Sequence, residues 1–203
     1  MRSMISTGLV IALMIAGGMA GAGCVASRPV HYYTIEPASP HMNQGRPDGF
    51  ILLVGNIATP AALQDGRIRY RAGSNDSGGY EYHRWTERPG TMVRTSLEHG
   101  LRDSGKYQRV LESGSSTTGD YLLRGKLYEF GEVDGASVQT KISLRVELVD
   151  TKTNRNVWDR LVEREEPVSS KNVTDVVQSL DRNLQRVVSE TAVEIDKFLT
   201  ARR

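Results

Sequence analysis

A regular alternation of apolar and polar side chains between residues 137 and 149 restricts the fold more than any other feature of the sequence. The apolar positions are Val138, Ile142, Leu144, Val146 and Leu148, and the polar positions are Gln139, Lys141, Ser143, Arg145 and Glu147. Successive side chains of a β-strand point to opposite faces of the sheet, so this period predicts a strand with one buried and one wet face. A wet face of this kind is typical of antiparallel sheets.

Short apolar runs bounded by turn residues predict seven further strands. Residues 121–130 precede the alternating segment and 156–164 follow it after the polar turn 150–154, which predicts an antiparallel meander. The other strands are predicted at residues 31–35, 50–57, 67–71, 79–83 and 107–111, with a hairpin joining 67–71 to 79–83. Residues 37–49 and 113–119 have no apolar period and are predicted loops.

Two segments have the period of an amphipathic helix. The first begins at Pro89, which suits a first turn, and ends before Gly105, which suits a helix stop. The second covers residues 172–199, and its broad apolar stripe indicates packing onto the sheet. Two such helices and a sheet with one wet face predict a two-layer α+β domain over residues 31–200, with a mainly antiparallel sheet and both helices packed on one face.

Composition excludes several classes of protein. The chain has a single cysteine, so an internal disulfide or a zinc site built from several cysteines is excluded, and the domain must fold by burying apolar side chains. Lys and Arg total 26 and Asp and Glu total 24, which gives a formal net charge of +2. So small an excess gives no electrostatic reason to expect nucleic acid as a partner.

The N-terminus has the features of an export signal. Arg2 is followed by an apolar run at residues 9–16 and by small residues up to Cys24. Ala22-Gly23-Cys24 resembles the lipobox of bacterial lipoproteins, although Gly21 stands where that motif favours leucine. We therefore expect a signal peptide at residues 1–23 and lipid attachment at Cys24. An uncleaved membrane anchor and ordinary secretion with a free thiol are the alternatives, and the glycine content argues against a spanning helix.

The lipidated cysteine and a short tether are expected at residues 24–30. Val25 to Pro29 spans at most about 3.5 Å per residue, so the folded domain should lie close to the lipid surface. In lipoproteins of enteric-type bacteria, an aspartate after the cysteine signals retention at the inner membrane. Val25 therefore favours an outer-membrane anchor with the domain facing the periplasm.

Motifs for catalysis, cofactors or metals are absent from the sequence. None of the four histidines, His31, His41, His83 and His99, has a neighbour at a metal-ligand spacing. There is no G-x-S-x-G elbow and no phosphate-binding loop. Glu163, Glu165 and Glu166 form an acidic cluster, but Arg160 and Arg164 lie among them, which favours an ion-paired surface. We expect neither a cofactor nor an enzyme.

An aromatic and basic stretch is the strongest candidate for a contact site. It contains Tyr80, Tyr82, Arg84, Trp85 and Arg88. In a structural interpretation, Tyr80 and Tyr82 share one face of a strand and Trp85 anchors the corner between strand and helix. In a functional interpretation, the stretch contacts a partner or lipid, with Arg84 and Arg88 available to phosphate.

With these residues identified, the chain resembles the ABC-type transport auxiliary lipoproteins from Tyr32 to about Leu199. The most specific match is the corner Arg84-Trp85-Thr86-Glu87-Arg88-Pro89. The remaining matches follow in order along the chain: Tyr32 to Pro37, Ile51 to Ile57, Ile68 to Arg71, Ser104-Gly105, Tyr107 to Val110 and Asp120 to Leu123.

The resemblance implies a non-catalytic, periplasm-facing lipoprotein that works with the components of an ABC transporter and with an MCE-domain substrate-binding protein. Such systems move lipids or other hydrophobic molecules across the cell envelope, and this component would dock the MCE protein at the outer membrane. Assembly into a homo-oligomer is compatible with that role. The competing hypothesis is a structural lipoprotein of another envelope assembly or secretion complex, and a lipid-anchored enzyme is a third.

The lipid anchor is directly testable. Replacing Cys24 with alanine should release the domain as a soluble periplasmic protein with its fold intact, because the acyl chains hold it on the membrane. Cell fractionation and metabolic labelling with a fatty acid measure this. The prediction fails if Cys24→Ala still fractionates with membranes and the wild-type chain takes up no fatty acid.

Overall fold

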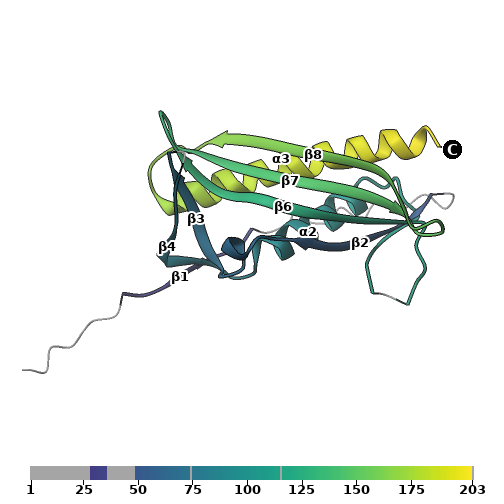
Figure 1. The fold of residues 1–203 in the computed structure, drawn as a ribbon, viewed down its shortest axis with the longest axis horizontal. Helices are drawn as coiled ribbons and strands as arrows, with labels where there is room; N and C mark the ends of the chain where they lie inside the picture. Colours follow the sequence, from purple (N-terminus) through teal and green to yellow (C-terminus); the bar gives the residue numbers. More distant parts are fainter. Residues whose placement is uncertain (1–27, 36–48, 74, 115, 203) are drawn as a thin grey trace, which may run out of the picture.

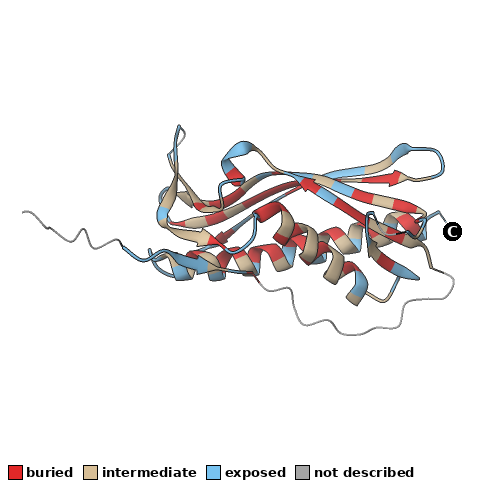
Figure 2. Ribbon diagram, turned by 90° about the horizontal axis from the view of Figure 1, so that it is seen from below, coloured by how far each residue is buried: buried red, intermediate tan, exposed pale blue. Residues whose placement is uncertain are grey.

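The computed structural model describes residues 28–35, 49–73, 75–114 and 116–202 (Figure 1). Within these ranges, the strands are β1 (His31–Tyr33), β2 (Ile51–Ala58), β3 (Arg67–Ala72), β4 (Asp76–Trp85), β5 (Arg109–Glu112), β6 (Tyr121–Asp134), β7 (Gln139–Asp150) and β8 (Arg155–Pro167). The helices are the short 3-10 helix η1 (Ala61–Leu63) and the α-helices α2 (Pro89–Asp103) and α3 (Val173–Thr200). The eight strands form one sheet, and both α-helices lie on the same face of it (Figure 2). The predicted two-layer α+β class is confirmed.

The predicted meander is the longest part of the sheet. β6 pairs antiparallel with β7 from Tyr121 to Val133, and β7 pairs antiparallel with β8 along almost its whole length. β6 and β8 both continue a few residues beyond the ends that the sequence predicted, to Asp134 and Pro167.

The other edge of β6 carries two separate groups of strands. β2 pairs parallel with the first half of β6 and β3 pairs parallel with its second half. β5 extends the first group, while β4 and β1 extend the second. The sheet is therefore mixed, with long antiparallel ladders in the meander and short parallel ones beside it. The sequence predicted the hairpin of β3 and β4 but none of the parallel pairs, because their partners are distant in the chain.

Charged side chains on the wet face of the meander form ion pairs with one another. Arg124 Nε lies 3.1 Å from Glu147 Oε2, and Arg145 Nη2 lies 2.6 Å from Asp159 Oδ2. The predicted alternation in β7 is thus confirmed, with one exception. Ser143 is buried on this face, where its hydroxyl donates to Glu163 Oε1 at 3.0 Å.

The opposite face of the sheet packs on the helices. The predicted stripe of α3 supplies fully buried side chains to this core, among them Leu180, Leu184 and Ile195. Asn183 is also fully buried, and its amide donates to the backbone carbonyls of Thr140 and Arg164 at 3.2 Å each. These bonds satisfy the buried amide nitrogen of Asn183, while its Oδ1 has no hydrogen-bond partner among the described residues.

Helices α2 and α3 contact each other at Gly100. A Cβ on this glycine would lie 2.3 Å from Cγ1 of Val188, which is far inside van der Waals distance. Valine has a restricted χ1 in a helix, so its side chain cannot easily move away. Gly100 is a poor helix former, but the close packing of the two helices leaves no room for a larger side chain.

We predict that Gly100→Ala destabilises the protein even though alanine is the better helix former. Overpacking costs about 1–3 kcal/mol, which outweighs the roughly 1 kcal/mol gained in helix propensity. Val188→Ala in the same chain should recover part of the loss, and urea unfolding of the double-mutant cycle measures it. Additive effects of the two substitutions would contradict the proposed contact.

Candidate functional site

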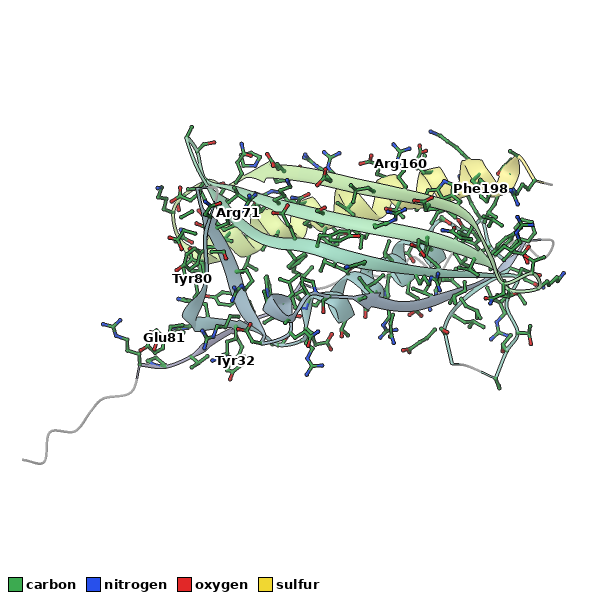
Figure 3. The ribbon with its side chains drawn as sticks, viewed as in Figure 1. Tyr32, Arg71, Tyr80, Glu81, Arg160 and Phe198 are labelled. Atoms are coloured by element: carbon green, nitrogen blue, oxygen red, sulfur yellow. The ribbon has the colours of Figure 1, made fainter. Side chains whose placement is uncertain are left out.

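The site lies where the chain enters the domain, at the pairing of β1 with β4. The strands are parallel, and Tyr32 is aligned with Arg84 and Tyr33 with Trp85. Arg28, the first residue that the structure describes, follows Cys24 by four positions. The predicted signal peptide and Cys24 themselves lie outside the described residues. Figure 3 shows Tyr32, Tyr80 and Glu81 at this end of the molecule, far from Phe198 near the end of α3.

One face of the β1–β4 pair is held by two histidines and a tyrosine. The rings of His31 and His83 stack with their centroids 5.3 Å apart and 17° between their planes. The hydroxyl of Tyr33 lies 2.9 Å from Nδ1 of His83, within hydrogen-bond distance. Because β1 has only three residues, these side-chain contacts are a large part of what attaches it to the sheet.

Tyr80 connects β4 to its neighbours. Its hydroxyl donates to Glu132 Oε2 at 2.6 Å, and its ring meets that of Tyr70 edge to face at 5.3 Å. Burial, together with the hydrogen bond to Glu132, raises the pKa of the Tyr80 phenol well above its ordinary value. Its ring also contacts that of His83 at 5.8 Å. Tyr80 therefore joins β4 to β6.

Trp85 belongs to the core. It is 4% exposed, and its ring meets that of Phe130 at 5.7 Å. Its backbone N–H donates to the carbonyl of Gly66 at 2.7 Å. This is the place that the structural interpretation gave it, at the corner between β4 and α2. The indole is thus withdrawn from the surface, which corrects its inclusion among the contact residues.

The other face of the β1–β4 pair forms what we call the outer patch, which is exposed at Arg28, Val30 and Tyr32 and half-buried at Tyr82 and Arg84. Tyr32 and Arg84 share this face because they are aligned in neighbouring strands. Tyr82 precedes Arg84 by two residues in β4, and Arg28 and Val30 lie just before β1. Tyr32 is 63% exposed and Val30 is 40% exposed. The guanidinium of Arg28 lies 5.8 Å from the centre of the Tyr82 ring, a cation–π distance.

The sequence pattern predicted only part of this patch. It included Tyr82 and Arg84 but missed Arg28, Val30 and Tyr32, because it did not predict that β1 pairs with β4. Arg88, the remaining predicted contact residue, is exposed at the N-cap of α2. The sequence had placed Arg28 and Val30 in the predicted tether and Tyr32 in the first predicted strand.

A cleft of about 140 Å³ lies on the wet face of the sheet beside η1. Its charged side chains are already engaged with each other. Arg71 Nη2 lies 3.2 Å from Glu129 Oε1, and Lys141 Nζ lies 3.2 Å from Glu129 Oε2. Within the described ranges, no group of three or more His, Cys, Asp or Glu side chains is arranged to hold a metal ion. No helix in the same ranges is long and apolar enough to span a membrane.

Comparisons with known proteins identify both a family and a fold. The model of a family described as "ABC-type transport auxiliary lipoprotein component" matches residues 33–192. The structure of protein XCC0632 from Xanthomonas campestris superposes with a TM-score of 0.74 at 20% sequence identity, covering 86% of this chain and all of that one. A second solved structure, of an uncharacterised protein, has a TM-score of 0.68 at 17% identity and covers 83% of this chain and 99% of its own. At these identities the likeness establishes the fold alone. A search of curated proteins finds no match.

The histidine stack predicts a pH dependence of stability. Burial, with the charge of His31 second, lowers the pKa of His83 below its ordinary value. The folded state then binds fewer protons than the unfolded state, so stability is lost as the pH falls through about 6.5 and below. The melting temperature of the wild-type chain should fall more steeply between pH 8 and pH 5 than that of His83→Gln.

Two further variants test the assignment to this stack. His31→Gln should remove part of the pH dependence, because it removes a neighbouring charge. His99→Gln on α2, outside this stack, is the variant with which the slopes of the two stack variants are compared. Equal slopes in the wild type and in His83→Gln would show that another group causes the effect.

Proposed function

Because the chain belongs to the family of ABC-type transport auxiliary lipoprotein components, we propose that it is a non-catalytic, lipid-anchored part of an ABC transporter system with an MCE-domain protein. The system would move lipids or other hydrophobic molecules across the cell envelope. This chain would act by docking the MCE-domain protein. The observation that carries the proposal is the family match, which spans residues 33–192 and so nearly all of the described fold.

The anchor is the first part of this proposal. Cys24 precedes His31, the first residue of β1, by seven residues, so an extended tether would place the start of β1 within about 25 Å of the acylated cysteine. Two or three acyl chains hold a protein on a bilayer far more firmly than one. The domain would then face the periplasm from the outer membrane, as Val25 favours.

The acidic cluster supports a role without catalysis. Its members lie on two faces of β8 and are each engaged by a cation. Glu163 and Glu165 lie 3.9 and 3.7 Å from Nζ of Lys141 on the wet face. Glu166 is buried on the other face, where it pairs with Arg186 of α3. Carboxylates separated and paired in this way hold the sheet and the helix together rather than act on a shared substrate.

Affinity capture from membranes tests the proposal. The intact, tagged lipoprotein is extracted in mild detergent with its bound partners, and these are identified by mass spectrometry. We expect an MCE-domain protein and ABC transporter subunits to be enriched. The matched control is Cys24→Ala, which should recover less of both, because the anchor holds the domain where the partners lie.

Two outcomes would contradict the proposal. Enrichment of the components of a secretion complex, without MCE or ABC subunits, would favour a structural lipoprotein of another envelope assembly. Equal recovery of the partners by the wild type and Cys24→Ala would show that docking does not depend on the anchor.

A further inference from the structure

We propose that the outer patch rests directly on the membrane that holds the lipid anchor, and that it prefers a surface of anionic lipids. The inference rests on the lipid anchor of the proposed function but not on any protein partner. It assigns a second attachment point to the domain, formed by the outward face of β1 and β4.

The composition of the patch suits the boundary between lipid and water. Tyr32 and Tyr82 each have an apolar ring and a polar hydroxyl, a combination that is enriched at the headgroup level of bilayers. Val30 adds exposed apolar area beside them. A tyrosine phenol is neutral at neutral pH, and the charge of Glu81 raises the pKa of the Tyr82 phenol further.

Two arginines of the patch are available to phosphate groups. In the part of the chain that the structure describes, neither Arg28 nor Arg84 has a carboxylate at ion-pair distance. Arg84 donates only to the backbone carbonyl of Asp65, at 3.3 Å. Each arginine close to an anionic membrane contributes on the order of fivefold in affinity. Glu81, which is exposed next to the patch, opposes this attraction.

The position of the patch argues for a membrane as the occupant. Three residues of the patch, Arg28, Val30 and Tyr32, follow Cys24 closely in the chain. A short tether therefore keeps them near the acyl chains. An extended chain from Cys24 to Tyr32 spans at most about 28 Å, which is comparable with the thickness of half a bilayer and its headgroups. A docked protein at this place would have to fit between the domain and the lipid surface.

The experiment places a reporter on the patch of the intact lipidated protein. Acylation consumes the single native cysteine, so a new cysteine is the only free thiol. Tyr82→Cys carries a solvatochromic dye in the patch, and Tyr32→Cys provides a second reading from the other strand. The matched control is Leu161→Cys on β8, which is 51% exposed. Its neighbour Arg160 lies well away from Tyr32 across the sheet (Figure 3).

The protein is reconstituted in vesicles of phosphatidylcholine and phosphatidylglycerol in equal parts, and recovery with floating vesicles confirms the anchor. A quencher attached to lipid should reduce the emission of the patch dyes at least about threefold more than that of the dye at position 161. Arg84→Gln should lower this quenching and Glu81→Gln should raise it. Both effects should disappear in vesicles of phosphatidylcholine alone.

The remaining outcomes overturn the proposal in distinguishable ways. If the protein floats with the vesicles but its patch dyes stay in water, the anchor stands and the membrane contact is wrong. If the dyes are shielded only after a purified MCE-domain protein is added, the patch binds protein and not lipid. If the protein does not float at all, the anchor and this proposal both fall.

Discussion

Strand β6 is the element on which the rest of the structure depends. One of its edges pairs with β7 over its whole length, and the other is divided between β2 and β3. This arrangement requires close approach of the backbones. A Cβ at Gly125 would lie 2.5 Å from the carbonyl oxygen of Arg145, and one at Gly131 would lie 2.5 Å from that of Arg69. Glycine at these two positions lets β6 keep its partners on both sides.

The two groups of strands beside β6 have different roles. β2 and β5 lie over α2 and complete the core, and their buried side chains are almost all aliphatic. β3, β4 and β1 carry Tyr32, Tyr33, Tyr70, Tyr80, Tyr82, His31 and His83, at the end where the chain enters the domain. Trp85 joins the two parts, because its ring packs on Phe130 of β6 while its strand leads into α2. A rigid core thus holds an aromatic corner next to the tether.

The β1–β4 pair separates two kinds of chemistry on its two faces. His31, Tyr33 and His83 share one face and attach β1 through side-chain contacts, while Tyr32 and Arg84 share the other face. A strand of three residues would be a weak link by backbone hydrogen bonds alone. The contacts of the histidines and Tyr33 therefore determine how firmly β1 is attached next to the tether. The outer patch on the other face is available for binding.

The sequence by itself determined the fold class, the meander and both helices, because each depends on a local apolar period. It also placed Trp85 at a corner and identified Tyr82 and Arg84 as candidate contact residues. Only the tertiary structure decided the parallel pairs, the burial of the Trp85 indole and the membership of Arg28, Val30 and Tyr32 in the outer patch. These features depend on contacts between strands that are about fifty residues apart in the chain, such as the pairing of His31 in β1 with His83 in β4. Pairing at that distance depends on how the whole sheet assembles on β6, and no local sequence pattern predicts it.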